Sequence, residues 1–362
     1  MKVAVLTFQN AVNYGAVLQA YSLQEALKTL GHDAQILDYR CDYLDRKKYL
    51  VQGAGIVKKL KHSVKSLMVG SKNDVFNAFR NERFALTRSY DRHSIGDSML
   101  EFDACVVGSD QVWNPSLTNF DQTYFLDFAQ GKKRVSYAAS MGAASFDEAT
   151  VEKMVCLVRA FDGVSVRECS AKDLLVSGGV PAESVEVVLD PVFLHNKDFW
   201  KGLAQHPARL DGEFVLVYAL GDVGQVIKTA TLSYPGKRII CVSNSVKRFD
   251  GAEMVMDFSP EEFLWALDNA SAVVTNSFHG FALSLLMERN VHFCLNKADV
   301  QDRSSRLVDL AKLFNVEFLS CTPGKTIENL DAAPDYERVE KLIQAEHKRS
   351  LEFLKNHLVF RG

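Results

Sequence analysis

The sequence lacks long hydrophobic runs and a strong excess of either charge. No stretch approaches the ~18 consecutive apolar residues of a membrane-spanning helix, so no such helix is expected. The formal net charge is only -3 over 362 residues, which gives no global basic field for nucleic acid, and no nucleic-acid partner is predicted. An anionic ligand would therefore be held by local cations or by helix amino ends.

The cysteines are few, and their spacing shows no paired pattern. The seven cysteines are odd in number, show no C-x-x-C pattern and lie in apolar segments such as 104–107. This argues against a disulfide framework and against zinc, and it favours reduced thiols in the cytoplasm. The histidines show no i, i+4 spacing, so no metal site is predicted. The apolar opening run, residues 1–8, is too short for the core of a signal peptide, which fits a cytoplasmic protein.

Two signatures of nucleotide binding are also missing. Neither G-x-G-x-x-G nor G-x-x-x-x-G-K-[ST] follows the first predicted strand, so dinucleotide and P-loop binding are not supported. The turn at 10–15 instead reads N-A-V-N-Y-G and opens a helix whose free N–H groups favour an anion or a sugar oxygen. Asn13 either contributes to such a site or caps the helix.

Short apolar, β-branched runs alternate with helical periodicity along the chain. Each run is followed by a turn, and this order predicts parallel sheets covered on both faces. The predicted strands are 2–8, 34–39, 104–107, 134–138, 163–166 and 185–189 in a first series, and 214–219, 238–242, 272–275 and 292–295 in a second. Two Rossmann-like α/β domains with a cleft between them are therefore expected.

The domain boundary is predicted near residue 208. An N-terminal domain would span 1–208, a C-terminal domain 209–335, and a long charged helix at 336–362 would brace back on the first domain. Residues 58–88 are basic and helix-like. A solvated helical face is the favoured interpretation of this segment, and peripheral contact with an anionic membrane is the alternative. Its lysines are Lys58, Lys59, Lys61, Lys65 and Lys72.

His279 stands in the run S-F-H-G, between an apolar strand and an apolar helix. This order places an imidazole at the carboxyl end of a buried strand and the amino end of a helix, where open α/β sheets collect ligands. The helix dipole favours the neutral ring, which suits proton exchange near neutral pH. The structural alternative is a buried histidine satisfied within the fold.

Two other predicted strands end in chemically useful side chains. The turn G-S-D-Q-V-W-N-P at 108–115 presents a carboxylate, two amides and an indole, the kind of groups that sugar hydroxyls need. Asp110 is a candidate base, unless it caps the turn while Trp113 plugs the domain edge. Arg167 follows the strand at 163–166, so its planar guanidinium suits a carboxylate or phosphate in a cleft. An ion pair with Glu168 or with the other domain is the alternative.

Several segments together resemble the polysaccharide pyruvyl transferase family. They are N-Y-G-A-V-L-Q-A-Y-S-L-Q (13–24), V-V-G-S-D-Q-V-W-N-P (106–115), S-Y-A-A-S-M-G (136–142), V-S-V-R-E (164–168), L-D-P (189–191) and S-F-H-G (277–280). The resemblance implies a fold similar to GT-B glycosyltransferases and transfer from phosphoenolpyruvate, a substrate rather than a cofactor. The acceptor would be a sugar of a surface or capsular polysaccharide precursor, free or lipid-linked. The products would be a pyruvate ketal and phosphate.

The resemblance also implies roles for individual residues. His279 would protonate the enol methylene, Arg167 would hold the donor, and Asp110 would act on the acceptor hydroxyl. Further donor contacts would be Ser277, Gly280, Arg303 and Arg306, and acceptor contacts would be Asn13, Tyr14, Gln19, Gln111, Trp113 and Asn114. Some branches of the family carry an arginine where this chain has Ser277, and Arg303 or Arg306 would have to supply that cation.

Two other functions fit the same sequence. One is a GT-B-type glycosyltransferase that uses a nucleotide sugar, because the cleft and the C-terminal helix would look the same. The other is a protein that binds or assembles polysaccharide without catalysis.

Overall fold

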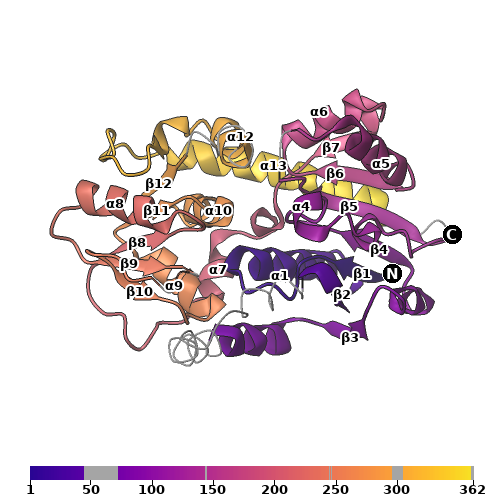
Figure 1. The fold of residues 1–362 in the computed structure, drawn as a ribbon, viewed down its shortest axis with the longest axis horizontal. Coiled ribbons are helices and arrows are strands. Elements are labelled where there is room, and N and C mark those ends of the chain that lie inside the picture. The colour runs from indigo at the N-terminus through magenta and orange to yellow at the C-terminus, as the bar shows by residue number, and fades with distance from the viewer. Residues whose placement is uncertain (45–71, 143–144, 244, 246, 296–304, 360–362) are drawn as a thin grey trace, which may run out of the picture.

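The computed structural model describes residues 1–44, 72–142, 145–243, 245, 247–295 and 305–359. Two parallel sheets, each flanked by helices, form two halves that lie side by side (Figure 1). The predicted fold class, two α/β domains with parallel sheets, is confirmed. Helices cover both faces of each sheet, and this explains why several central strands are buried along their whole length.

The first sheet has seven parallel strands in the order β3-β2-β1-β4-β5-β6-β7. The order reverses between β1 and β4, where the chain leaves one side of the sheet and continues on the other. The strands are β1 Lys2–Leu6, β2 Asp33–Tyr39, β3 Leu86–Tyr90, β4 Ala104–Val107, β5 Lys133–Ala139, β6 Gly163–Val166 and β7 Val185–Val187.

The second sheet has six parallel strands in the order β10-β9-β8-β11-β12-β13. Its order reverses between β8 and β11, and every residue of these two strands is buried. The strands are β8 Val215–Tyr218, β9 Ile239–Val242, β10 Glu253–Val255, β11 Ala272–Thr275, β12 Val291–Cys294 and β13 Ser320–Cys321.

Helices begin at side chains that can cap them. Asn13 caps α1, Ser277 caps α10, and Ser259 with Glu262 forms a capping box on α9. The α-helices are α1 Tyr14–Thr29, α4 Pro115–Thr118, α5 Glu148–Val158, α6 Cys169–Ser177, α7 Lys197–Leu203, α8 Val223–Ser233, α9 Pro260–Asn269, α10 Phe278–Leu286, α12 Ser305–Leu313, α13 Tyr336–His357 and residues 72–83. Short 3₁₀ helices are η1 Ile95–Leu100, η2 Gln122–Phe125, η3 Ala182–Ser184, η4 Pro191–Leu194 and η5 Glu317–Leu319.

Three strands, β3, β10 and β13, are absent from the sequence prediction, and all three lie at sheet edges. Edge strands are short or partly exposed, so they lack the apolar run that marks a central strand. The predicted helical character of 58–88 is wrong at its end, because the described helix stops at residue 83 and residues 86–90 form β3.

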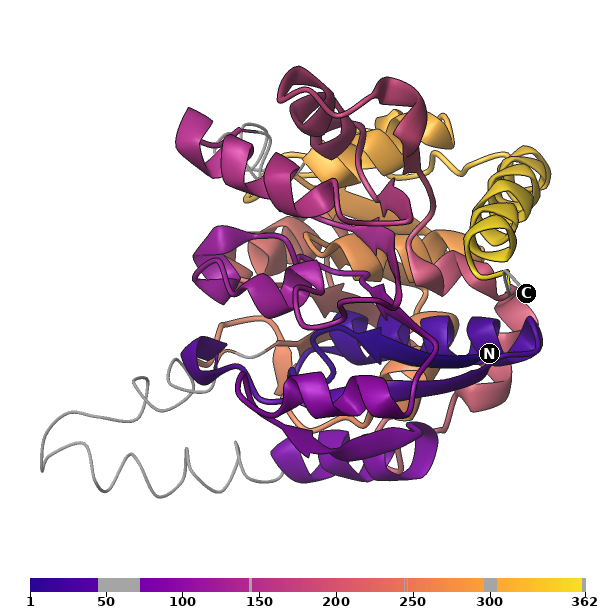
Figure 2. The ribbon, with the colours of Figure 1, turned by 90° about the vertical axis from the view of Figure 1, so that its right-hand side faces the viewer.

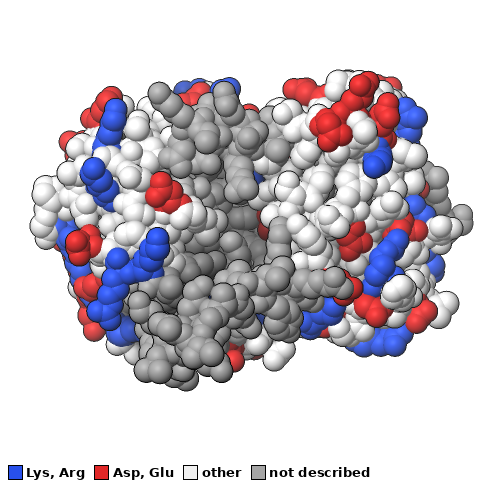
Figure 3. Space-filling view, in the orientation of Figure 1, with Lys and Arg blue, Asp and Glu red and all other residues white. Residues whose placement is uncertain are grey.

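The basic segment is described only in part. Lys58, Lys59, Lys61 and Lys65 lie outside the described residues. Lys72 is buried rather than solvated, and its Nζ lies 5.2 Å from the centroid of the Tyr14 ring. Elsewhere, the face seen in Figure 3 carries acidic and basic side chains interspersed over both halves.

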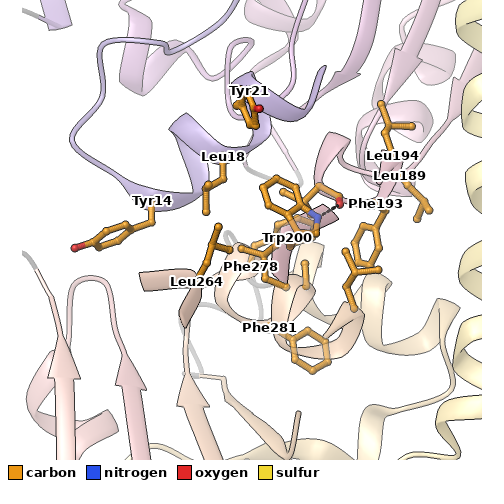
Figure 4. Close-up of a cluster of buried hydrophobic side chains, with 14 of the residues drawn as sticks. Tyr14, Leu18, Tyr21, Leu189, Phe193, Leu194, Trp200, Leu264, Phe278 and Phe281 are labelled. Atoms are coloured by element: carbon orange, nitrogen blue, oxygen red, sulfur yellow. Dashed lines mark hydrogen bonds between the residues drawn. The ribbon is translucent and has the colours of Figure 1, made fainter. Parts of the chain in front are cut away.

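One hydrophobic cluster joins the two halves. Aromatic and leucine side chains from α1, η4, α7, α9 and α10 converge there (Figure 4). Trp200 of α7 is fully buried in the cluster, and its Nε1 donates to the carbonyl of Val192 at 3.0 Å. Helix α7 also packs on α9 of the second half, although α7 lies before the predicted domain boundary near residue 208. The link between the sheets is therefore part of the core.

Helix α13 crosses from the second half to the first (Figures 1 and 2). There the backbone N–H of Leu189 donates to Ser350 Oγ at 3.0 Å, and the rings of Tyr137 and Phe353 lie 6.4 Å apart. The Nζ of Lys133 donates to the carbonyl of Val359 at 2.9 Å. The helix thus fixes the segment that follows β7, where the candidate site begins.

Candidate active site

The two points at which strand order reverses open onto one cavity of about 330 Å³. Loops at the carboxyl ends of β1, β4, β8 and β11 line it, which is where open α/β sheets bind ligands. Its walls come from both halves. The lining residues are Ala11, Asn13, Ala16, Asp110, Gln111, Leu117, Leu220, Gly221, Asn276, Ser277, Phe278, His279, Cys294, Arg306 and Leu307.

His279 lies in the first turn of α10, and only 6% of the residue is exposed. Its Nε2 lies 3.3 Å from Oδ2 of Asp190, a residue of the first half. The ring packs directly on Gly15 in the first turn of α1, since a Cβ at Gly15 would lie 2.1 Å from Nδ1. A histidine from one half is therefore seated in a slot built by the other.

Asp190 is completely buried and holds several groups at once. Its Oδ2 lies 2.6 Å from Nη1 of Arg167, 3.1 Å from Oγ of Ser109 and 3.3 Å from His279. Its Oδ1 accepts the backbone N–H of Val192 at 3.1 Å. Burial by itself raises the pKa of this carboxyl, but the charges and hydrogen bonds of His279 and Arg167 outweigh burial and bring the pKa well below its usual range. Asp190 therefore stays ionised.

Arg167 combines the ion pair expected from its sequence context with unused donors. Nη1 binds Asp190, Nε lies 3.7 Å from Oε2 of Glu168, and the guanidinium lies 4.5 Å from the centroid of Phe278. Nε and Nη2 are buried, and neither makes a hydrogen bond within the part of the chain that the structure describes. Buried N–H groups without partners are destabilising, so an anionic ligand would stabilise this side chain.

A second cavity, of about 490 Å³, begins at Arg167 and Asp190. Helices α6, α12 and α13 and the end of β7 line it. Phe278 and Arg306 line both this cavity and the one that contains His279. Arg167 thus lines the larger cavity and His279 the smaller one, and the two cavities meet at a wall that includes Phe278 and Arg306.

Arg306 is the second cation at this wall. Its Nε is buried and makes no hydrogen bond to any described residue. Burial and the positive charge of Arg167 together lower the pKa of Arg306 to about 10. Two guanidinium groups that repel each other form a site in which an anion would be stabilising. Arg303, the other predicted cation, lies outside the described residues.

Asp110 and Gln111 line the cavity on the side of the first sheet. Asp110 has a left-handed backbone conformation with φ 63°, which few residues other than glycine, asparagine and aspartate adopt readily. Its Oδ1 accepts its neighbour's backbone N–H at 2.9 Å, and the Gln111 side chain pairs with Asn114 Nδ2 at 2.8 Å. Asp110 thus closes a turn, as one interpretation predicts, and also faces the cavity.

Three predicted acceptor contacts are buried in the protein instead. Trp113 stacks on Phe125 at 5.4 Å and donates its indole N–H to the Tyr124 carbonyl. The hydroxyl of Tyr14 donates to Phe258 O at 2.9 Å, and Gln19 bonds Thr7, the Ala16 carbonyl and the Ser109 N–H. Their placement offers no surface to a sugar. Aromatic and amide groups next to a strand serve core packing as readily as ligand binding, and sequence alone does not separate the two.

The other predicted contacts mainly shape helix ends. Asn13 and Ser277 cap α1 and α10 and also line the cavity, whereas Asn114 caps the short helix α4 and is nearly buried. Gly280 lets α10 approach the second sheet, since a Cβ there would lie 2.6 Å from Oγ1 of Thr275. Ser277 does not replace the family's arginine chemically, but Arg306 lines the same cavity.

Asp190 and Gly15 are the site residues that sequence reasoning did not assign. Asp190 lies shortly after β7, at the end of the apolar run 185–189, and this position is the signal that could have pointed to it. Within the described residues, no three histidine, cysteine, aspartate or glutamate side chains gather as a metal ion would need. No helix in the described part of the chain has the length and apolar character to cross a membrane.

Comparisons with known proteins agree with this architecture. A family model described as Polysaccharide pyruvyl transferase matches residues 13–297. No curated protein sequence matches the chain. HepE from Anabaena, solved in complex with UDP-glucose, is similar over 98% of this chain and 100% of its own, with a TM-score of 0.56 and 10% identity.

Two epimerase structures show the same likeness. The UDP-GlcNAc 2-epimerase of Methanocaldococcus jannaschii, in complex with UDP-GlcNAc and UDP, covers 98% of this chain and 100% of its own, with a TM-score of 0.52 and 13% identity. A putative UDP-N-acetylglucosamine 2-epimerase of Listeria monocytogenes covers 98% and 90%, with a TM-score of 0.53 and 13% identity. Identities this low show a shared fold, which is the GT-B fold.

Proposed function

Because this chain belongs to the polysaccharide pyruvyl transferase family, we propose that it transfers a pyruvyl group from phosphoenolpyruvate to a sugar of a surface or capsular polysaccharide precursor. The observation that carries the proposal is the wall shared by the two cavities. Two arginines with N–H groups that no described residue satisfies lie at this wall, beside a histidine paired with a buried carboxylate. An anionic donor that must be protonated on carbon needs both features.

The donor carries a carboxylate and a phosphate on the same carbon. Arg167 and Arg306 would bind these two anions, and the guanidinium fork of Arg167 is preorganised because it is held between Asp190 and the Phe278 ring. Arg306 takes the place of the cation that other family branches have at the position of Ser277. Its repulsion from Arg167 is relieved when an anion lies between the two groups.

The reaction begins with a proton transfer from His279 to the methylene carbon of phosphoenolpyruvate. C2 then becomes cationic, a first sugar hydroxyl adds to it, and the C2–O bond to phosphate breaks. A second hydroxyl of the same sugar adds to C2 and closes the ketal. Of the two hydroxyl protons, one replaces the proton given to the methylene and the other leaves with phosphate. Asp110, which lines the cavity with Gln111 and Asn13, accepts the proton of the attacking hydroxyl.

The same proposal places the enzyme in the cytoplasm, with a free or lipid-linked saccharide as acceptor. Peripheral contact with the inner face of the membrane would bring it to lipid-linked sugars. The segment proposed for that contact, Lys58 to Lys65, lies outside the described residues, so vesicle binding of a variant lacking these lysine charges is the way to test it.

The direct test is incubation with phosphoenolpyruvate and either synthetic galactosides or lipid-linked saccharides. We expect acceptor-dependent phosphate release and a product with the mass of a pyruvate ketal. A parallel incubation with nucleotide sugars tests the glycosyltransferase alternative. Sugar transfer from a nucleotide donor without any ketal would overturn the proposal, and binding of saccharide without turnover of either donor would support the non-catalytic alternative.

His279→Ala tests the assigned acid. We expect turnover to be abolished while the melting temperature falls only slightly, because Asp190 keeps its contacts with Arg167 and Ser109. Activity assays and thermal unfolding measure the two effects. Retained turnover would remove His279 from the chemistry, and a collapse of the fold would support a purely structural histidine.

A further inference from the structure

Asp190 lies where it can determine which ring nitrogen of His279 transfers a proton to the substrate. The carboxylate belongs to the first half and the imidazole to the second, and they meet at 3.3 Å between Oδ2 and Nε2. We propose that Asp190 is the positioning residue of His279: it holds Nε2, so that Nδ1 is the nitrogen that carries the proton to the substrate. This inference rests on the proposed function, because it names the atom through which the assigned acid acts.

The Nε2 side of the ring has one acceptor nearby. Nε2 is buried and has no hydrogen-bond partner of good geometry among the described residues, and Asp190 is the only acidic group of those residues within ion-pair distance of it. An ionised carboxylate can only accept, so a neutral His279 must keep its proton on Nε2 to avoid facing Asp190 with a lone pair. Nδ1 is then the basic nitrogen of the neutral ring.

The Nδ1 side of the ring packs on Gly15, where only a glycine fits. A side chain at this position would collide with the ring, because its Cβ would lie 2.1 Å from Nδ1 and 2.3 Å from Cγ. His279 as a whole lines the cavity between the sheets, and its Nε2 edge is buried in the protein. The Nδ1 edge and the amino end of α1, which Asn13 caps, therefore lie together beside the cavity.

Asp190 is itself fixed, so it can fix the histidine. The backbone N–H of Val192 binds Oδ1, Arg167 and Ser109 bind Oδ2, and Ser350 anchors the residue just before it through the N–H of Leu189. Three contacts to the carboxylate and one to the neighbouring backbone prevent Asp190 from rotating away. A carboxylate held in this way orients an imidazole and stabilises its charged form when the ring picks up a proton.

The test is nitrogen NMR of the full-length protein labelled with ¹⁵N-histidine, with His279→Ala used to assign the signal. In the wild type we expect the neutral ring to carry its proton on Nε2. In Asp190→Asn, whose amide can both donate and accept, we expect the proton of the neutral ring to be found on Nδ1 as well as on Nε2. In Arg167→Gln, the matched control that keeps the carboxylate of Asp190, the proton should stay on Nε2. None of these measurements needs a substrate.

Activity assays of the same variant link Nδ1 of His279 to the reaction. In Asp190→Asn, kcat should fall by more than about 100-fold, while KM for phosphoenolpyruvate changes much less. A wild-type ring with its proton on Nδ1 overturns the proposal even if Asp190→Asn does not fold. A change of tautomer in Asp190→Asn without any pyruvyl transfer by the wild type would instead retain the Asp190–His279 pair and remove only the proposed reaction.

Discussion

At the scale of single residues, Gly15 lies against the ring of His279 and leaves no room for a side chain. Substitution by alanine puts a Cβ 2.1 Å from Nδ1 of that ring, so the imidazole or the start of α1 must move. We expect kcat of Gly15→Ala to fall about 100-fold, as displacements near 1 Å do in active sites. Overpacking should destabilise the fold by about 1 to 3 kcal/mol.

Gly202 in α7 provides the matched control. It is exposed, and a Cβ there would meet no described atom within 4 Å. Gly202→Ala should leave kcat unchanged and the melting temperature equal or slightly higher, because alanine loses less backbone entropy in a helix. Equal kinetics for Gly15→Ala and Gly202→Ala would mean that Nδ1 is not at the reacting centre.

Trp113 either packs in the core or stacks on a sugar, and substitution of this residue separates the two interpretations. Its indole is 1% exposed and donates to the Tyr124 carbonyl, so Trp113→Phe should destabilise the protein by about 1 to 3 kcal/mol through a cavity and the loss of this hydrogen bond. The KM for the acceptor should stay the same. Gln111→Ala, at the cavity wall, should show the reverse pattern: a higher acceptor KM and a nearly unchanged melting temperature. Kinetics and chemical denaturation of the two variants decide between core packing and sugar stacking.

At the scale of elements, the helix of residues 72–83 packs on α1 through a buried lysine. Burial lowers the pKa of Lys72 to about 8, although Asp257 opposes this shift. The unfolded chain binds its proton up to about pH 10.4, so between pH 8 and 10.4 it holds more protons at this position than the folded protein. The contribution of Lys72 to stability therefore rises with pH across that window.

Substitution of Lys72 by methionine isolates this effect. We expect Lys72→Met to be more stable than the wild type at pH 7, and the difference to shrink by about 2 to 3 kcal/mol as pH rises to 10.4. Urea unfolding at several pH values measures it. Lys341→Met on α13, where the side chain is exposed, should show no such trend. A pH-independent difference for Lys72→Met would contradict a lowered pKa.

At the scale of the whole molecule, the two halves share one core. The cluster in Figure 4 draws side chains from helices of both halves, and Asp190 with His279 and Tyr14 with Phe258 tie them through polar contacts. We therefore expect one cooperative unfolding transition rather than two, with equal calorimetric and van't Hoff enthalpies.

Removal of one of these polar contacts tests whether the two halves unfold together. Tyr14→Phe leaves the Phe258 carbonyl without its donor and should lower stability by about 1 to 2 kcal/mol while the transition stays single. Differential scanning calorimetry of both proteins measures the number of transitions. Two resolved transitions in the wild type would show that the halves unfold independently.

Much of the secondary structure could be predicted, and the reason is local. Central strands of a covered parallel sheet are buried along their whole length and consist mostly of apolar and small residues, so β4, β6 and β11 have the bounds that their sequences indicate. Edge strands such as β3 and β10 are only half buried and carry no comparable pattern. The positions of His279, Arg167 and Asp110 at strand ends follow from the same periodicity.

The sequence by itself determined two parallel-sheet halves and a set of polar residues at the ends of their strands. Only the tertiary structure decided which of these meet: it seated His279 on Gly15 and Asp190 of the other half, and it turned Tyr14, Gln19 and Trp113 into the interior. Periodicity along the chain records whether a residue faces a core. Which side chains lie within 3 or 4 Å of one another depends on how the two halves pack together. The local sequence pattern carries no information about that packing.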